Sequence, residues 1–323
     1  MANIHVMGAG WYGCHLALSL QAEHSVRIFD PKGAFAGASG ANQNRLHLGF
    51  HYPRSAETRR QSVQGFTQFL THYPDLSLPC NNWYAIHRQR SLIDLETYCA
   101  VMTSSGLTFR LGNPEIHLRE MEGYLECDER IVCTQKACKF FEAQLDIQSG
   151  DGFQEKADYY IDCTGGLWFN VPNYIYEPCV MLHYSGPVNH PAITVMDGPF
   201  FTIYPTETPG LFTVYSVPHT PLCQTQAYRR AAVCLQQYNQ AALLRQRHQI
   251  ETQITQLYPD FLTHFQFANH VTTIRTKPTA QCALRGCAVV QQGNTLHVSP
   301  GKIDNIFHAT ALVNQSLQAA QLR

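Results

Sequence analysis

Three glycines close to the N-terminus are the first residues whose type and spacing indicate a specific chemistry. Gly8, Gly10 and Gly13 form the pattern G-x-G-x-x-G between an apolar stretch and a stretch with helical spacing. In such a turn the first glycine permits the tight bend, the second lets a pyrophosphate approach the backbone, and the third lets the helix pack closely on the strand. The N–H groups at the start of the helix then face the phosphates. The pattern predicts a dinucleotide site.

Asp30 is placed to complete this site. It ends the second apolar stretch, HSVRIFD, and its carboxylate is positioned to accept hydrogen bonds from an adenosine ribose. An acid at this position argues against a phosphate on the ribose, and therefore against NADP. It leaves NAD and FAD open.

A second candidate segment, SGANQNRLHLGFHYPRS, occupies residues 39–55 and is dense in amides, histidines and arginines. If the segment is extended, alternate side chains share a face, so Arg45 and His47 point the same way. An arginine binds a carboxylate through paired hydrogen bonds, and a histidine accepts a proton near neutral pH. Both are candidate catalytic side chains. The alternative for His47 is a buried structural histidine.

The elements that position these residues follow from periodicity. Two apolar strands around a helix of residues 14–22 make a βαβ unit. β-rich segments broken by proline and glycine at residues 175–220 indicate an antiparallel sheet in a second domain. Residues 225–258 predict one or two long polar helices, and the C-terminal stretch from Thr295 predicts a strand, a tight turn and a helix. The fold class expected is α/β, with a second, β-rich α+β domain.

Composition excludes several classes of protein. Hydrophobic residues make up 45% and charged residues 15% of 323 residues, which is typical of a globular chain. The formal net charge of -1 gives no reason to expect nucleic-acid or membrane binding. No apolar run is long enough to span a membrane, and the absence of a signal-peptide pattern favours a cytoplasmic protein. The cysteines include no C-x-x-C and the histidines no H-E-x-x-H, so we expect reduced thiols and no metal site.

Beyond Asp30 the sequence resembles the FAD-dependent oxidoreductases of the D-amino-acid oxidase type. Ala38-Ser39 and NQNRLHLG, residues 42–49, resemble the family segment that passes along the flavin, and H-x-G-x-x-Y from His47 is similar to the branch with 2-hydroxy-acid dehydrogenases. ADYYIDCTGG, residues 157–166, resembles the family's strand-to-turn element. HVSPGKIDNIF, residues 297–307, resembles its C-terminal flavin element. The likeness runs in order across nearly the whole chain.

The resemblance implies FAD as cofactor and assigns residues to three sets. The implied cofactor-binding residues are Gly8, Gly10, Trp11, Tyr12, Gly13, Asp30, Ser39, Asn44, Arg45, Leu46, Thr164, Gly165, Gly301, Lys302 and Ile303. The implied catalytic residues are Arg45, His47 and Lys302. The candidate substrate residues are His51, Tyr52, Tyr204, Tyr215, Arg275 and Arg285.

The implied activity is hydride transfer to flavin from a C–N or C–O bond of a small polar substrate, such as an amino acid, a hydroxy acid or a sugar intermediate. The electron acceptor is left open, and an oligomer is possible. The alternatives are an NAD-dependent Rossmann dehydrogenase and a non-catalytic flavin-fold binding protein. We expect an FAD-binding domain of residues 1–80, 130–172 and 285–323, and a substrate domain of residues 81–129 and 173–284.

Two departures from the family pattern bear on the adenosine end of the cofactor. Asp30 stands where the family more often has glutamate. The stretch between FFEAQL and DCTGG is also shorter than usual, and the strands that help hold adenine are normally found there. No sequence motif convincingly indicates covalent attachment of the flavin.

Overall fold

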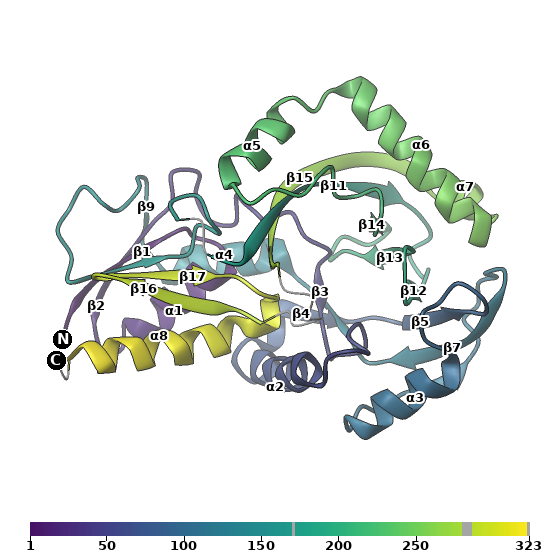
Figure 1. Cartoon of the computed structure of the whole chain (residues 1–323), viewed down its shortest axis with the longest axis horizontal. Helices are drawn as coiled ribbons and strands as arrows, with labels where there is room; N and C mark the ends of the chain where they lie inside the picture. The colour runs from purple at the N-terminus through teal and green to yellow at the C-terminus, as the bar shows by residue number, and fades with distance from the viewer. Residues whose placement is uncertain (170–171, 280–285, 322–323) are drawn as a thin grey trace.

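The computed structural model describes residues 1–169, 172–279 and 286–321, and its strands form three sheets. The six-stranded sheet has the order β16-β17-β10-β1-β2-β9, and the eight-stranded sheet has the order β15-β11-β14-β13-β12-β5-β7-β6. A three-stranded sheet, β3-β8-β4, completes the set. Figure 1 shows the two larger sheets at opposite ends of the long axis, with β3 and β4 between them.

The six-stranded sheet contains the predicted βαβ unit. Its strands are β1 (Asn3–Met7), β2 (Ser25–Phe29), β9 (Ile147–Gln148), β10 (Tyr159–Asp162), β16 (Ala288–Gln292) and β17 (Thr295–Ser299). β1 is parallel to both β2 and β10, and β10 is parallel to β17. The helices α1 (Trp11–Leu20) and α8 (Ile306–Gln321) pack against each other, and α8 runs along the sheet in Figure 1.

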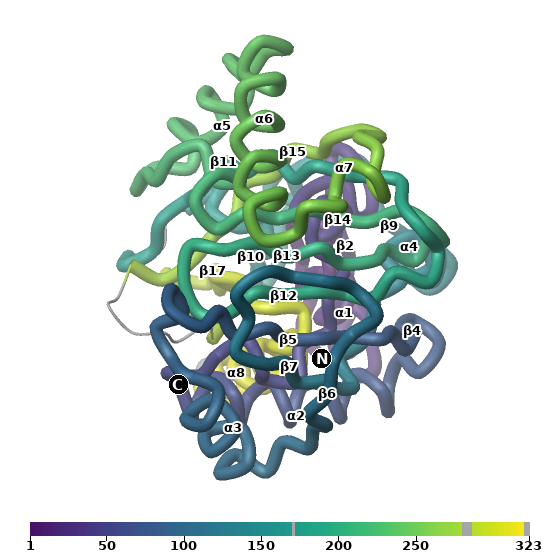
Figure 2. Tube along the Cα trace, turned by 90° about the vertical axis from the view of Figure 1, so that its right-hand side faces the viewer, coloured from purple at the N-terminus to yellow at the C-terminus, as the bar shows by residue number. Residues whose placement is uncertain are grey.

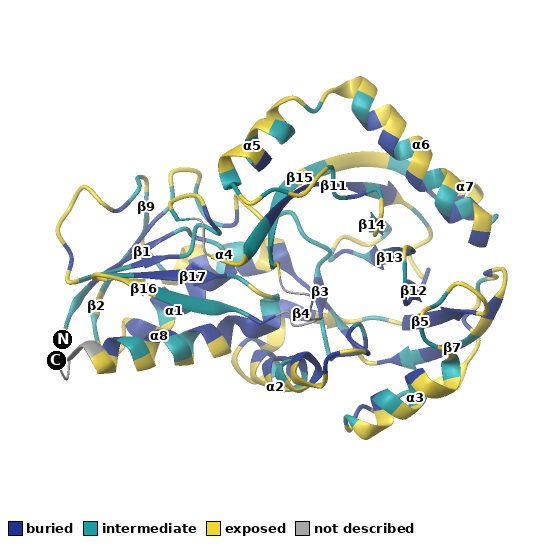
Figure 3. Ribbon diagram, in the orientation of Figure 1, coloured by how far each residue is buried: buried dark blue, intermediate teal, exposed yellow. Residues whose placement is uncertain are grey.

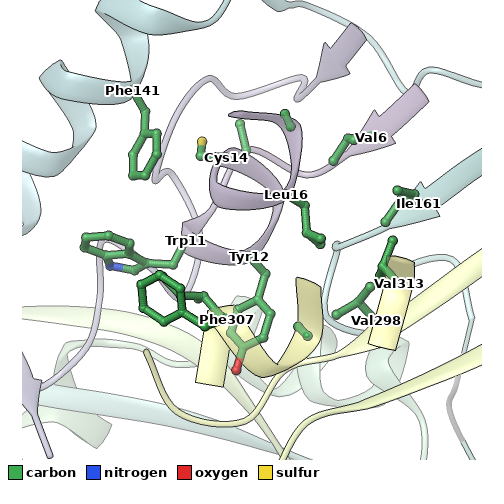
Figure 4. Close-up of a cluster of buried hydrophobic side chains, with 14 of the residues drawn as sticks. Val6, Trp11, Tyr12, Cys14, Leu16, Phe141, Ile161, Val298, Phe307 and Val313 are labelled. Carbon is green, nitrogen blue, oxygen red and sulfur yellow. The ribbon is translucent and has the colours of Figure 1, made fainter. Parts of the chain in front are cut away.

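A hydrophobic core surrounds α1, which is buried along most of its length. The Trp11 indole packs against the rings of Phe35, Phe69 and Phe141 at centroid distances of 5.1, 5.4 and 5.7 Å. Figure 4 shows this cluster, with Tyr12 beside Phe307 of α8. Phe69 and Phe141 come from α2 (Ala56–His72) and α4 (Thr134–Gln144), so these helices fix the position of α1.

The eight-stranded sheet carries helices on both faces, with α6 against one and α3 against the other. Its strands are β5 (Asn82–His87), β6 (Arg110–Gly112), β7 (Met121–Cys127), β11 (Tyr174–Ser185), β12 (Ala192–Met196), β13 (Phe201–Pro205), β14 (Leu211–Ser216) and β15 (Gln266–Pro278). The helices α5 (Tyr228–Gln236), α6 (Gln240–Leu257) and α7 (Phe261–His264) arch over it in Figure 1. α3 (Leu95–Ser104) lies at the β7 end. Figure 3 shows that α6 buries one side and exposes the other.

Strand alternation separates the two faces of this sheet. Ile193, Ile203 and Val214 join the core beneath α6. Their sequence neighbours Thr194, Thr202 and Tyr215 point to the opposite face of the sheet. On that face Thr194 pairs in register with Thr202, and Thr202 pairs with Tyr215. In Figure 2, β14, β13, β12 and β5 lie one below another, with α6 above them. The sheet therefore presents a row of hydroxyl groups on the face away from α6.

The small sheet joins the two large ones. Its strands are β3 (Arg45–Leu46), β4 (Ser77–Pro79) and β8 (Arg130–Val132), and β8 pairs antiparallel with both neighbours. The remaining elements are two short 3₁₀ helices, η1 (Pro74–Leu76) and η2 (Ile303–Asn305). β3 thus places the middle of the polar segment, residues 39–55, between the dinucleotide sheet and the polar face of the eight-stranded sheet.

The architecture confirms the predicted α/β class with a β-rich second part. Both ends of the first helix differ from the predicted residues 14–22: α1 ends at Leu20, and it begins early, at Trp11, where a distant side chain caps it. Among the described residues, no helix combines the length and apolarity needed to cross a bilayer. In the same parts of the chain, no three His, Cys, Asp or Glu side chains are grouped as metal ligands would be.

Candidate active site

The glycine turn is held in a shape that only glycine permits. Gly8 has φ +95°, and a Cβ on Gly13 would lie 1.8 Å from the Gly8 carbonyl oxygen. A Cβ on Gly10 would lie 2.6 Å from Ser39 Oγ, which accepts a hydrogen bond from Trp11 N at 2.8 Å. Ser39, one of the implied cofactor-binding residues, therefore caps α1 and lies at the glycine turn. The buried Trp11 side chain belongs to the core, so only its backbone faces the turn.

Asp30 stabilises the same turn from the end of β2. Its Oδ2 accepts a hydrogen bond from Ala9 N at 2.9 Å, and its Oδ1 accepts one from Lys32 N at 2.9 Å. A carboxylate has about four acceptor positions, so these two bonds leave capacity for ribose hydroxyls.

The turn after β10 abuts the glycine turn. A Cβ on Gly8 would lie 2.9 Å from the Cys163 carbonyl oxygen. The side chain of Thr164 donates to Asp162 Oδ1 at 2.6 Å, and the Gly165 carbonyl accepts from Thr276 Oγ1 at 2.9 Å. Because Thr276 lies on β15, this turn also connects the dinucleotide sheet to the eight-stranded sheet.

Tyr12 connects the first helix to the C-terminal turn. Its hydroxyl accepts a hydrogen bond from Gly301 N at 2.8 Å and donates one to the Lys302 carbonyl at 2.7 Å. Burial raises the pKa of Tyr12, so the hydroxyl keeps its proton. Lys302 N donates to Asn305 Oδ1 at 3.1 Å. The Gly301 and Lys302 amides expected to face the cofactor thus have acceptors within the chain, and Ile303 begins η2.

The Lys302 side chain is buried, with only 7% of it exposed. Its Nζ lies 3.2 Å from Asp304 Oδ2 and 5.0 Å from the centre of the Tyr52 ring. Among the described residues, neither Lys302 Nζ nor the Asp304 carboxylate makes a hydrogen bond. The turn therefore holds a buried ion pair with unused donors and acceptors.

Arg45 is buried on the polar face of the eight-stranded sheet. Its guanidinium donates to Thr194 Oγ1 at 2.6 Å and to Tyr84 OH at 3.1 Å, and it lies 4.2 Å over the Tyr204 ring. Burial disfavours the charge, but Tyr84 and Glu129 outweigh it and raise the pKa of Arg45. Because these groups surround the guanidinium, it is enclosed in an internal network.

The neighbours of Arg45 in the sequence point elsewhere. Asn44 has φ +53°, and its side-chain oxygen accepts a hydrogen bond from Thr134 Oγ1 at 2.8 Å, at the start of α4. Leu46 is fully buried in the core around α1. These two predicted cofactor residues therefore anchor the segment on both sides of Arg45.

His47 lies between Glu129 and two aromatic rings. Its Nδ1 is 3.6 Å from Glu129 Oε1, and its ring centre is 5.6 Å from that of His51 and 5.4 Å from that of Tyr52. The Lys302 ammonium also lies over the Tyr52 ring. The structure thus brings the predicted catalytic residues into one neighbourhood, together with the candidate substrate residues His51 and Tyr52.

Three further substrate candidates, Tyr204, Tyr215 and Arg275, lie on the polar face. The Tyr204 hydroxyl donates to the Arg130 carbonyl at 3.1 Å, and the ring is fully buried. Arg275 lies 5.4 Å over the Tyr215 ring and donates from Nε to Glu177 at 2.9 Å. Arg285 lies outside the described residues.

Sequence reasoning missed the two buried carboxylates at this face. Glu129 precedes β8 in an ordinary charged stretch, and no spacing rule links it to Arg45. Glu177 lies on β11 and pairs with Arg275 and Lys277; burial raises its pKa, but the two cations bring it below the usual range. The positions of the threonines could have been predicted from the sequence, since strand alternation alone places Thr194 and Thr202 on the face opposite to the apolar residues.

The residues present fit a flavin dinucleotide. The glycine turn and Ser39 form a close backbone cradle at a helix N-terminus, which suits a pyrophosphate. The partly unsatisfied Lys302–Asp304 pair supplies buried polar groups near the polar segment.

Comparison with known proteins identifies close relatives, although no protein-family model matches the chain. The FAD-dependent monooxygenase FPY4 of Fusarium mangiferae is 38% identical over 331 residues, which cover 95% of this chain and 89% of that protein. The FAD-dependent monooxygenase kojA of Aspergillus flavus is 27% identical over 359 residues, covering 95% of this chain and 83% of the relative.

A solved structure shows the same fold. Glycine oxidase from Geobacillus kaustophilus superposes with a TM-score of 0.69 at 12% identity, over 97% of this chain and 93% of that protein. With FAD-dependent relatives and this fold, the cofactor is FAD and the protein is an oxidoreductase. Both alternatives, an NAD-dependent dehydrogenase and a non-catalytic binding protein, are set aside. The chain belongs to the family of FAD-dependent oxidoreductases that includes FPY4.

Proposed function

We propose that this oxidoreductase is of the D-amino-acid oxidase type and oxidises a C–N or C–O bond of a small polar substrate. The observation that carries the proposal is the convergence of His47, Tyr52 and Lys302 beside the polar face of the eight-stranded sheet. An amino acid, a hydroxy acid or a sugar intermediate has hydroxyl or amine groups that match such a face. When bound, FAD supplies a two-electron acceptor for the hydride equivalent.

The proposal gives His47 the role of proton acceptor. Oxidation of an amine or alcohol requires removal of the proton on nitrogen or oxygen, and an imidazole accepts it near neutral pH. Lys302 contributes a buried positive charge near the developing negative charge. In this proposal Arg45 acts from within the protein, since its two terminal nitrogens donate to Tyr84 and Thr194. It holds the polar segment and contributes charge.

An anion subsite is proposed at the other end of the polar face. Arg275 and Lys277 share the single carboxylate of Glu177, so this group carries an excess positive charge. The Tyr215 ring lies beneath Arg275. A substrate carboxylate is the complementary group.

We also propose the domain division expected from the sequence, with residues 1–80, 130–172 and 285–323 binding FAD. The strands of the six-stranded sheet all fall within these segments, and those of the eight-stranded sheet fall within residues 81–129 and 173–284. The site then lies between two separately built sheets.

Anaerobic reduction of the bound flavin tests the proposal. Amino acids, 2-hydroxy acids and sugar derivatives are mixed with the holoenzyme without oxygen, and absorbance near the flavin maximum is followed. An oxidase or dehydrogenase is bleached by its substrate alone. Failure of all these classes, including larger amines and alcohols, would contradict the proposal.

The names of the relatives favour monooxygenation as a second candidate. In that case a nicotinamide cofactor, not the substrate, reduces the flavin, and oxygen from O₂ enters the product. Reduction by NADH or NADPH, with label from ¹⁸O₂ in the product, would support this candidate against the first.

A further inference from the structure

Glu129 is a fully buried carboxylate that the proposed function has not used. It lies between β7 and β8. Its Oε1 accepts a hydrogen bond from Leu48 N at 2.9 Å, and its Oε2 accepts one from Tyr84 OH at 2.8 Å. A buried carboxylate requires such donors, since leaving it unpaired costs several kcal/mol.

The two oxygens of Glu129 face the nitrogen atoms of two different basic side chains. Oε2 lies 3.9 Å from Arg45 Nε, and Oε1 lies 3.6 Å from His47 Nδ1. The second distance exceeds a hydrogen bond, but it is short enough for charge to act strongly in a buried site. Burial raises the pKa of Glu129, and the His47, Arg45 and Tyr84 contacts outweigh it and bring the pKa to about 2. The carboxylate is therefore ionised at neutral pH.

We propose that Glu129 is a positioning residue that keeps the proton of neutral His47 on Nδ1 and leaves Nε2 as the basic nitrogen. The other tautomer would direct the lone pair of Nδ1 at a carboxylate oxygen, which is electrostatically unfavourable. The assignment of Nε2 as the base for substrate rests on the proposed function, whereas the tautomer itself does not.

Glu129 also prepares the site for the proton. When His47 accepts one, the imidazolium lies next to an anion whose other oxygen already faces Arg45. Within the described parts of the chain, the His51 and Tyr52 rings also contact His47, and Lys302 Nζ lies 5.0 Å from the centre of the Tyr52 ring. A carboxylate beside a base orients the ring and stabilises the charge it acquires.

Nitrogen NMR of the wild-type protein tests the tautomer directly. Protein labelled with ¹⁵N-histidine is compared with His47→Gln, in which the missing signals identify His47. We expect the neutral ring to carry its proton on Nδ1. A ring protonated on Nε2 would overturn the proposal. The measurement needs neither substrate nor turnover, so it decides the role of Glu129 even if the proposed reaction is wrong.

Glu129→Gln tests the functional consequence, since glutamine keeps the shape and an acceptor for Leu48 N but removes the charge. We expect FAD content and substrate affinity to be retained and flavin reduction by substrate to slow roughly tenfold to a hundredfold. Because an imidazolium beside an amide is less stable, the acidic limb of the rate profile should move to lower pH.

Glu126→Gln is the matched control on β7. Glu126 lies three residues before Glu129 and pairs with the exposed Arg110 at 3.0 Å, so its loss should leave the rate and the pH profile unchanged. If the Glu129→Gln enzyme loses stability but keeps the wild-type rate of flavin reduction and the wild-type acidic limb of the pH profile, then the Glu129 carboxylate has a purely structural role. If the variant does not fold, nitrogen NMR of the wild-type protein still decides whether Glu129 sets the tautomer of His47.

Discussion

Gly13 shows how closely the dinucleotide turn depends on one missing atom. An alanine Cβ there would lie 1.8 Å from the Gly8 carbonyl oxygen, so the backbone must move. We expect Gly13→Ala to destabilise the protein by about 2 kcal/mol or more and to reduce retained flavin. Thermal unfolding and the flavin-to-protein absorbance ratio after gel filtration measure both effects.

Gly37→Ala is the matched control, because nothing lies within 4 Å of a Cβ at that position. It should retain flavin and stability. A Gly13→Ala protein with full flavin content would show that the turn tolerates a side chain.

His15 predicts how stability depends on pH. It is buried, 2.7 Å from the Tyr73 hydroxyl and 4.6 Å from the Phe307 ring centre, and burial, with a smaller effect of His72, lowers its pKa to about 3. The unfolded chain protonates this histidine near pH 6.5. The unfolded state therefore binds the extra proton, and the contribution of neutral His15 to stability is lost as pH falls from about 6.5 toward 3.

His15→Leu should flatten the loss of unfolding free energy over this range, as measured by denaturant titrations at several pH values. The exposed His308 on α8 provides the control, and His308→Gln should keep the wild-type slope. Parallel curves for wild type and His15→Leu would contradict the assignment.

Some chemistry at the residue scale follows from sequence, and some does not. The types of Arg45 and His47 and their spacing predict a reactive segment, because alternation places both on one face. Their common partner Glu129 lies in the loop between β7 and β8, far away in the sequence. Glu129 reaches Arg45 and His47 because β8 pairs with β3, and a local sequence pattern does not specify that pairing. The engagement of Arg45 by Thr194 and Tyr84 has the same cause.

Two free cysteines lie close together where a loop packs against the helix α5. Cys223 is exposed in the segment before α5, Cys234 lies on α5, and their sulfur atoms are 3.8 Å apart. We expect mild hydrogen peroxide to join them, with two thiols losing their hydrogens to form S–S and peroxide reduced to water. Because the loop also holds Gln224 against Glu177 at 2.8 Å, the bond would tether α5 beside the proposed anion subsite.

Peptide mapping without reductant detects the linked peptides, and thermal unfolding should show a gain on the order of 2 kcal/mol. Cys234→Ser should abolish both changes. Full alkylation of both thiols after peroxide treatment would refute the expectation.

Element boundaries were predictable where periodicity is strong. α5 and α6 fall within the helical stretch expected at residues 225–258, and β12, β13 and β14 fall within the β-rich stretch expected at residues 175–220, because these stretches have regular apolar patterns between turn signals. The start of α1 could not be predicted from the local pattern, since the residue that caps it, Ser39, lies in another part of the chain. β3 is also invisible to pattern analysis, because two residues carry no period.

FAD binding should stabilise the whole molecule, because the proposed cofactor residues come from segments far apart in sequence. A ligand that binds only the folded state raises stability by mass action, by about 2.7 kcal/mol at a hundredfold excess over its dissociation constant. We expect the unfolding temperature of the apoprotein to rise with FAD concentration. NAD serves as the control, and equal stabilisation by NAD would count against FAD as the cofactor.

The topology of the whole molecule could be predicted only in outline. The succession of patterns indicates a dinucleotide unit with a β-rich insertion, but not which strands become neighbours. The three-stranded sheet brings together β3, β4 and β8 from distant parts of the sequence. A second junction lies where β11 begins and β15 ends, and there Thr279 N donates to the Asn173 carbonyl at 2.7 Å. These junctions depend on tertiary contacts.

The position of β1 has a consequence for synthesis of the protein on the ribosome. β1 and β2 are translated before β10, which covers the other side of β1 and follows more than a hundred residues later, and β17 is translated later still. The nascent βαβ unit therefore waits with an unpaired strand edge, a state exposed to misassembly and chaperone binding. The six-stranded sheet to which FAD would bind is complete only after β17 has left the exit tunnel.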